Sequence, residues 1–455
     1  MSLLNALRPG GRHGVPTSES RDPIGLVVAG LNRLAQSDVL DRVGLRKQAE
    51  QAVFTVTRTG FRSVTTASRT FARAGSAGRP GSRVPSSPRT GVFDLTPTED
   101  EQMLVDLVSE YAAEVLRPSA SEADEACEAP EPVLKAGLEI GLPVLGVPEV
   151  LGGISEERSA MAGALVAEAL AHGDMGLAVA ALAPGSVATA LGLWGTEAQQ
   201  QTYLPSFTDG DVPAAALALT EPTVLFDVLS PATTAVRQAD GGYRLDGLKS
   251  AVVRGAQAEL FVVGAELDGS PCLFLVESST SGLTIESDPA MGVRAASLTR
   301  LHLDGVTVPA EALLGEADGS TYTECVRLSR IAWCALAVGT SQAVLDYVTP
   351  YVKGREAFGE PIAHRQSVAF MVANIAIELQ AMRLLTYKAA GHVAAGKDAA
   401  RSTALARKAC ADKGMQIGLD GVQLLGGHGF VKEHPVERWY RDLRAVGVME
   451  GSVMI

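Results

Sequence analysis

Three short stretches near the end of the chain decide how it is interpreted: Gln423-Leu-Leu-Gly-Gly-His-Gly-Phe430, Pro435-Val-Glu-Arg-Trp-Tyr-Arg-Asp442 and Met449-Glu-Gly-Ser452. A helix-like pattern over residues 397–425 precedes them. Gly426, Gly427 and Gly429 end that pattern and allow the backbone to approach a flat or charged group. Glu450 is the carboxylate of an otherwise apolar turn, and a carboxylate among apolar neighbours can act as a base.

The order and spacing of these stretches resemble the C-terminal domain of the acyl-CoA dehydrogenases. That family reads Q-x-x-G-G-x-G-[FY], then P-V-E-R-x-x-R-D, then E-G-[TS]. The resemblance extends from about residue 95 to the last residue, and the first ninety or so residues lie outside it. It implies FAD as cofactor, an acyl-CoA thioester as substrate and Glu450 as the base.

Hydrophobic periodicity divides the chain and predicts an α+β fold. Residues 93–212 form an N-terminal all-α domain, 213–316 a small antiparallel β domain, and 317–455 a C-terminal four-helix bundle. Helix-like patterns cover residues 103–116, 132–141, 156–171, 197–207, 322–348, 365–393 and 397–425. A capping box at Thr96-Pro-Thr-Glu99 is predicted to start the first domain. This order of domains agrees with the resemblance.

The β domain is predicted from turn signals. Asp240-Gly241-Gly242 and Asp268-Gly269 each separate two alternating segments, which predicts two hairpins. Segments 301–304 and 306–309 complete the unit, which we expect to be a compact barrel or sandwich.

Composition excludes several classes of protein. With 46% apolar and 20% charged residues over 455 positions, the chain is typical of a soluble globular protein with a large core. Its five scattered cysteines favour a reducing compartment over a disulfide framework or a metal site. The net charge of −13 argues against nucleic acid as the main partner. No uninterrupted apolar run of about eighteen residues exists, so we predict no membrane span.

The first 92 residues form a basic extension. Residues 1–90 contain fourteen Lys and Arg against five Asp and Glu, and Gly, Ser, Pro and Arg dominate both ends. Residues 23–72 have a helix-like pattern. A targeting peptide and a helix on a membrane surface over residues 20–73 are two alternatives. We favour an extension of a cytoplasmic protein that docks weakly on its own acidic body.

The resemblance implies α,β-dehydrogenation of the thioester. A base removes the α proton while the β carbon gives a hydride to flavin N5, and the backbone N–H of Glu450 and a ribityl hydroxyl polarise the carbonyl. Some family members carry the base one residue before a typical arginine, which is Arg330 here. That position is Ser329, so Glu450 is the candidate base. Arg330 has two interpretations, an ion pair in the bundle or a contact at the substrate end.

The resemblance also implies a cofactor site. A turn of the form R-x-x-F-G-x-P-[IL] and the glycine stretch reach across a subunit interface to a neighbour's FAD, and a T-E-P loop contacts the flavin edge. The matching cofactor residues are Thr220, Arg355, Phe358, Gln366, Gln423, Gly426, Gly427 and Ser452, and Arg330 and Gly451 match substrate contacts. Arginine suits a pyrophosphate and phenylalanine an adenine ring. A helix–turn–helix with a charged cap is the plainer alternative for the arginine turn.

The chain departs from the family at the flavin. Phe226 replaces a serine that would touch the pyrophosphate, and Ala251 and Val253 replace a tryptophan and a threonine. Losing several polar contacts would weaken FAD binding by orders of magnitude. One alternative is therefore a subunit of a heteromeric acyl-CoA dehydrogenase, in which a related chain holds the flavin. Another is a non-catalytic structural subunit, and an oxidase is a further one.

The resemblance implies an electron-transfer flavoprotein as acceptor and a homo- or heterotetramer as assembly. It also implies one more helix after Glu450, where the sequence has five residues.

Overall fold

The computed structural model describes residues 97–153, 158–208 and 212–455. The chain divides into two units, Met1–Val92 and Phe93–Ile455, and all described residues belong to the second. The basic extension, including the helix predicted over residues 23–72, lies outside the described residues.

The first part of the described chain is helical. Its elements are α4 (Glu99–Tyr111), η3 (Ala112–Leu116), α5 (Arg117–Ala126), α6 (Glu131–Glu139), η4 (Leu142–Val144), η5 (Glu149–Leu151), α7 (Ala160–Gly173), α8 (Met175–Trp194), α9 (Glu197–Tyr203) and α10 (Pro205–Thr208). The capping box predicted at Thr96 is wrong by two residues. Thr98 Oγ1 accepts the Glu101 N–H at 3.1 Å, and Glu101 accepts the Thr98 N–H at 2.9 Å. Both spacings satisfy the Thr-x-x-Glu pattern, so the pattern alone does not choose between them.

The Ala-rich stretch becomes two helices, α7 and α8, that meet at Asp174. Asp174 caps α8, because its Oδ1 accepts the Leu177 N–H at 3.0 Å. Among the described helices, α8, α11 and α12 have the length and apolar composition of membrane spans. Within the protein, 89% of the α8 window and 78% of the α11 window are buried, against 17% for α12. The core therefore accounts for the apolar character of α8 and α11.

The middle part is one eight-stranded sheet of order β6-β7-β3-β2-β4-β5-β8, with β1 paired to β4. The strands are β1 (Ala215–Ala218), β2 (Thr234–Arg237), β3 (Tyr243–Val252), β4 (Leu260–Leu267), β5 (Ser270–Glu277), β6 (Leu283–Ser287), β7 (Thr299–Val308) and β8 (Leu313–Leu314). The short helices η6 (Arg294–Ala296) and η7 (Ala310–Ala312) lie between them in sequence. Both predicted hairpins are confirmed by the antiparallel pairs β2–β3 and β4–β5. The sequence predicted two separate segments at residues 301–304 and 306–309. Residues 299–308 instead form the single strand β7.

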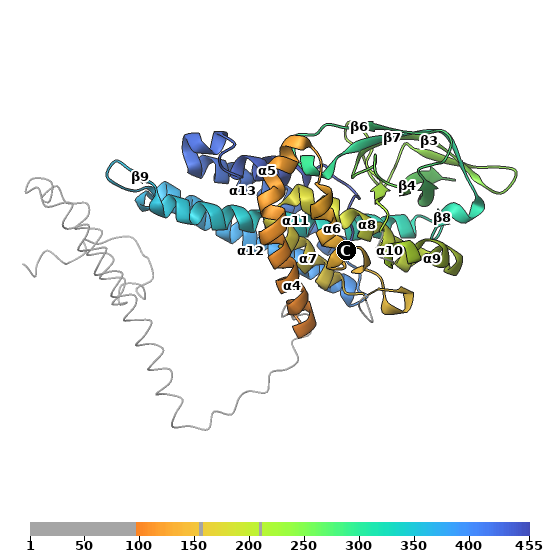
Figure 1. The fold of residues 1–455 in the computed structure, drawn as a ribbon, viewed down its shortest axis with the longest axis horizontal. Helices are drawn as coiled ribbons and strands as arrows, with labels where there is room; N and C mark the ends of the chain where they lie inside the picture. The colour runs from red at the N-terminus through yellow and green to blue at the C-terminus, as the bar shows by residue number, and fades with distance from the viewer. Residues whose placement is uncertain (1–96, 154–157, 209–211) are drawn as a thin grey trace, which may run out of the picture. The chain divides into compact units, whose positions relative to one another are not determined.

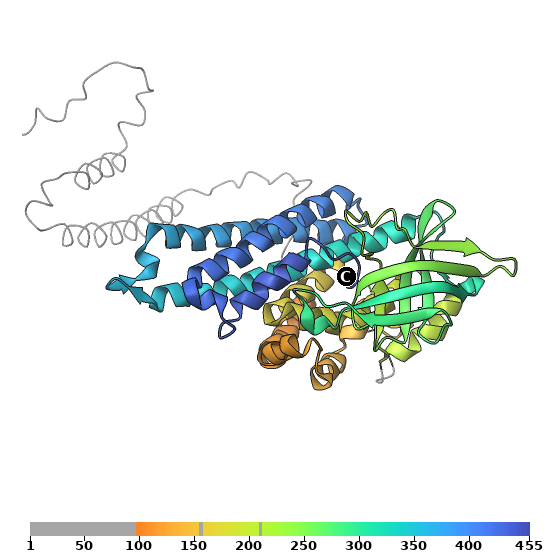
Figure 2. The same cartoon turned by 90° about the horizontal axis from the view of Figure 1, so that it is seen from above.

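The last part is the helical bundle. Its long helices are α11 (Ser320–Gly354), α12 (Gln366–Ala394) and α13 (Ala400–Leu425), followed by η9 (Gly426–Phe430) and α14 (Val436–Ala445). A small turn joins α11 to α12 through β9 (Glu356–Ala357), β10 (Glu360–Pro361) and η8 (Ile362–His364). The long helices lie side by side, and the sheet lies at one end of them (Figures 1 and 2). Helix α11 contacts both α7 and α13 and so joins the two helical parts.

A buried ion pair fixes the loop after β1. Lys249 Nζ on β3 lies 2.7 Å from Glu221 Oε1, and both side chains are almost fully buried. Burial lowers the pKa of Lys249 to about 8, against the opposing effect of Glu221. Burial alone would raise the pKa of Glu221, but Lys249 outweighs it and the pKa is lowered. The pair therefore holds Thr220, the neighbour of Glu221, at a defined position.

We predict that Lys249→Met lowers the free energy of unfolding by about 3–5 kcal/mol, because Glu221 is left buried without its cation. The double variant Lys249→Met/Glu221→Gln should recover much of that loss, since no unpaired charge remains. Denaturant unfolding measures both. The matched control is Arg237→Met, whose exposed pair with Asp268 should contribute little. Equal losses in the single and double variants would contradict this account.

Candidate functional site

Glu450 lies in the segment after α14 and is held by two arginines. Arg330 on α11 forms a two-bond fork with its carboxylate, at 2.9 Å from Nε to Oε2 and 2.8 Å from Nη2 to Oε1. Arg407 on α13 donates from Nη2 to Glu450 Oε1 at 3.1 Å and to the Met449 carbonyl at 2.7 Å. The apolar surroundings expected for Glu450 are thus replaced by an ion-paired cluster. The hydrogen bonding of Arg330 to Glu450, in which Arg330 is the donor, is the largest cause that raises the pKa of Arg330.

The backbone of Glu450 is bonded to Thr220. Thr220 Oγ1 donates to the Glu450 carbonyl at 2.8 Å and accepts from the Glu450 N–H at 3.2 Å. The resemblance matched Thr220 to a flavin contact and the Glu450 N–H to the thioester carbonyl. In this structure the two groups bond to each other.

The turn that follows Glu450 is anchored on α11. Ser329 Oγ donates to the Gly451 carbonyl at 2.7 Å, and Trp333 Nε1 donates to the same oxygen at 2.8 Å. Gly451 and Ser452 have φ of 71° and 72°, a left-handed backbone that turns the chain sharply. Ser452 Oγ lies 3.5 Å from the Ala251 carbonyl. Ser329, at the alternative position for the base, is therefore an anchor for the turn.

Residues 453–455 are buried beside this turn. The Met454 N–H donates to Ser186 Oγ at 2.9 Å, and Arg158 Nη1 donates to the Ile455 carbonyl at 2.5 Å. Gly163 on α7 faces Ile455, and a Cβ at Gly163 would lie 2.8 Å from the Ile455 Cβ. These apolar side chains fill the space between the helical domain and the Glu450 cluster.

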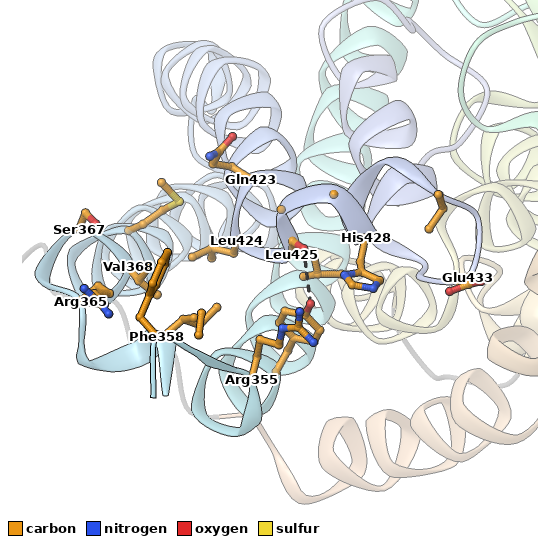
Figure 3. Close-up of a pocket in the computed structure, with 17 residues that line it drawn as sticks. Arg355, Phe358, Arg365, Ser367, Val368, Gln423, Leu424, Leu425, His428 and Glu433 are labelled. Atoms are coloured by element: carbon orange, nitrogen blue, oxygen red, sulfur yellow. Dashed lines mark hydrogen bonds between the residues drawn. The ribbon is translucent and has the colours of Figure 1, made fainter. Parts of the chain in front are cut away.

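A second site lies at the other end of the bundle. It is a cleft of about 990 Å³ between the α11–α12 turn and η9 (Figure 3). Its walls include five of the eight predicted cofactor residues: Arg355, Phe358, Gln423, Gly426 and Gly427. Gln366 lies between two lining residues, Arg365 and Ser367, but is not in the wall. Thr220 and Ser452 are instead at Glu450.

The chemistry of the cleft fits a nucleotide diphosphate. Among the described residues, the Arg355 guanidinium makes no hydrogen bond or ion pair, and Phe358, Gly426 and Gly427 line the same cleft. Phe358 is 96% exposed, with the Arg365 guanidinium 5.5 Å from its ring centroid. A Cβ at Gly426 or Gly427 would meet nothing within 4 Å, so the backbone there is open to a ligand. A guanidinium without a partner among the described residues suits phosphate oxygens, and an exposed aromatic ring suits an adenine.

The Glu450 cluster and the cleft contact α11 at positions that are far apart. Arg330 and Tyr351, which lines the cleft, are twenty-one residues apart on this helix. At about 1.5 Å per residue this separation is about 30 Å. A nucleotide with its adenine in this cleft would have to span about that distance to reach Glu450 of the same chain.

The flavin-loop positions that depart from the family are also placed. Val224 and Leu225 are 95% and 96% exposed, and Phe226 is half-buried against the core. Val253, at the threonine position, is fully buried in the main core and has no free surface.

The arrangement of a helical domain, a sheet and a helical bundle with a nucleotide-sized cleft is that of a class of oxidoreductases. Three family models match the chain: the acyl-CoA dehydrogenase N-terminal domain over residues 98–211, the middle domain over 216–306 and the C-terminal domain over 319–455. The chain belongs to the acyl-CoA dehydrogenase family.

Individual proteins agree with this assignment. Cyclohex-1-ene-1-carbonyl-CoA dehydrogenase of Geobacter metallireducens is 33% identical over 368 residues, which are 79% of this chain and 96% of the relative. The solved butyryl-CoA dehydrogenase of Megasphaera elsdenii has a TM-score of 0.72 and 29% identity, over 79% of this chain and 96% of its own. A structure from work on the electron transferring flavoprotein of Acidaminococcus fermentans has a TM-score of 0.73 and 31% identity, over the same shares. The predicted family, α+β fold and oxidoreductase class are confirmed.

Sequence reasoning missed Arg407. It lies on α13 more than forty residues before Glu450 and belongs to none of the quoted motifs. The available signal was its position inside a helix that packs on α11, where a buried cation requires an acid as partner.

We predict that Glu450→Gln lowers the free energy of unfolding by about 1–3 kcal/mol, because Arg330 and Arg407 then face each other without a counter-charge. Denaturant unfolding of the described unit within the full chain measures this. Glu110→Gln is a matched control, since Glu110 is exposed on α4 and forms no ion pair among the described residues. A Glu450→Gln variant as stable as this control would contradict a stabilising role for the cluster.

Proposed function

We propose that this chain takes part in flavin-dependent α,β-dehydrogenation of an acyl-CoA thioester, as one of at least two chains that share each FAD. The observation that carries the proposal is the cleft with an unpaired Arg355, an exposed Phe358 and open backbone at Gly426 and Gly427. Its distance from Glu450 favours a cofactor whose reactive ring belongs to the site of a second chain. A copy of this chain or a related chain can fill that role.

The cleft residues have separate tasks in this proposal. Arg355 forks onto the diphosphate, the open space at Gly426 and Gly427 allows the diphosphate to approach the backbone, and Phe358 stacks on the adenine. Gln423 completes the polar wall, and Gln366 lies in sequence between two wall residues. Bound FAD supplies the acceptor for the hydride that leaves the β carbon.

Glu450 is the candidate base for the α proton. Hydrogen bonds from Arg330 and Arg407 occupy both oxygens of its carboxylate. Proton abstraction therefore requires the side chain to turn away from the two guanidiniums toward the thioester. Breaking the hydrogen bond from the Glu450 N–H to Thr220 Oγ1 would free that amide to donate to the carbonyl oxygen of the thioester. Arg330 and Gly451 then border the substrate, and residues 453–455 must make room for the acyl chain.

A heteromeric enzyme is the second candidate, and the flavin loop favours it. Val224 and Leu225 place exposed apolar side chains where the family has a polar loop, and Val253 is buried where a flavin contact is expected. A related chain with an intact loop would hold the flavin ring, while this chain supplies the cleft. An electron-transfer flavoprotein is the proposed acceptor in either case.

The first test is the flavin content of the full-length chain, purified alone and again after co-expression with a related chain. We expect Arg355→Gln to lose bound flavin, because the diphosphate loses its fork. Arg327→Gln is the control, since Arg327 pairs with Glu324 on the same helix away from the cleft. Visible absorption per chain measures both. A yellow native protein supports a copy of this chain as partner, and colour only after co-expression supports the heteromer. Flavin retained in Arg355→Gln would contradict the proposed use of the cleft.

The second test distinguishes a catalytic role of Glu450 as the base from a purely structural role in the ion-paired cluster. We expect Glu450→Gln to lower the rate of acyl-CoA dehydrogenation by about 100- to 10,000-fold while flavin content stays unchanged. Glu450→Asp keeps the charge and should retain part of the rate. Stopped-flow bleaching of the flavin absorption measures the rate. Unchanged reduction in Glu450→Gln would remove Glu450 from the mechanism and leave the non-catalytic alternative.

A further inference from the structure

His428 stands at the cleft without an assigned task. It belongs to η9, directly after the open glycines Gly426 and Gly427, and its side chain lines the cleft. The ring lies on the same side of the cleft as the Arg355 guanidinium (Figure 3). Among the described residues its ring nitrogens make no hydrogen bond, and its ring makes a T-shaped contact with the His434 ring at 5.8 Å between centroids.

A second histidine, His434, lies next to His428 but is already bound by its neighbours. His434 Nδ1 lies 2.6 Å from the Tyr347 hydroxyl, and its ring also contacts Tyr351. His434 is therefore held within an aromatic cluster, whereas no described residue occupies either ring nitrogen of His428. The charged groups that share this part of the wall are Arg355, which is cationic, and Glu433, which is anionic.

We infer that His428 is an additional ligand of the nucleotide diphosphate, beside Arg355, and that it makes nucleotide affinity depend on pH; this inference rests on the proposed function of the cleft. A neutral imidazole donates one hydrogen bond, whereas an imidazolium donates two and adds a positive charge. Bonds between an imidazolium and phosphate oxygens are about twice as strong as neutral ones. Histidine is the side chain that changes charge between about pH 5 and pH 8. Affinity should therefore rise as the pH falls.

The adenine end is separate from this effect. Phe358 and Arg365 lie toward the opposite side of the cleft from His428 (Figure 3). A ligand without phosphates can stack on Phe358 but cannot use His428. Adenosine and ADP therefore distinguish a diphosphate ligand from a general change in the cleft.

The experiment titrates ADP and adenosine into the full-length chain by isothermal calorimetry, at about pH 5.5 and about pH 8. Phosphate itself titrates near pH 6, so native and variant proteins are compared at each pH. We expect His428→Asn to weaken ADP binding about tenfold at the lower pH and much less at the higher pH, with adenosine binding unchanged.

Two controls isolate His428. His364→Asn removes a histidine of the adjoining turn that pairs with Glu360 and is not in the cleft wall, and it should bind ADP like the native chain. Glu433→Gln removes the carboxylate that would also respond to acid, and it should keep the pH dependence. A pH dependence that disappears in Glu433→Gln and persists in His428→Asn would overturn the inference.

Different results would contradict the inference about His428 and the proposed function of the cleft. If His428→Asn binds ADP like the native chain at both pH values while Arg355→Gln binds weakly, His428 is not a ligand and the cleft remains a nucleotide site. If the native chain, freed of flavin before the titration, binds no ADP, or Arg355→Gln binds it equally well, the proposed function of the cleft fails and the inference fails with it.

Discussion

The three-residue cluster of Arg330, Glu450 and Arg407 is the interaction on which the described unit depends. It ties the middle of α11, the first half of α13 and the segment after α14 into one contact. Charges this poorly exposed are stable only when they are paired, so the segment after α14 must enter the interior to meet the two arginines. Once it does so, Ser329, Trp333 and Thr220 fix its backbone, and the apolar side chains that follow fill the space beside α7.

The same cluster restrains the candidate base. Two guanidiniums occupy the oxygens of Glu450, so its side chain must leave them before it can reach the α proton of a substrate. The far end of the cleft is about 30 Å away along α11, and its Arg355 forms no ion pair among the described residues. The charged groups at one end of the bundle thus pair with one another. At the other end Arg355, which has no partner among the described residues, can bind a group from outside the chain. This asymmetry is the physical basis for a cofactor shared between chains.

The sequence predicted the cleft better than it predicted the surroundings of Glu450. Arg355 and Phe358 lie three residues apart in the same turn, and residues 423–427 lie at the end of one helix. Local structure therefore places the residues of each motif. Only the approach of α11 to α13 was needed to bring the two motifs together. The hairpins at Asp240-Gly241-Gly242 and Asp268-Gly269 were predictable for the same reason, because a two- or three-residue turn fixes the pairing of its flanking strands.

By itself the sequence determined the family, the order of helical and β parts, both hairpins and two motifs that supply five residues of the cleft wall, because periodicity and contiguous motifs act over a few residues. Only the tertiary structure decided that Glu450 is ion-paired, that Arg407 is its second partner, and that Thr220 bonds to its backbone. Those contacts join residues 43 to 230 positions apart in the chain. Their geometry depends on how α11, α13 and the sheet pack, and no local pattern carries that information.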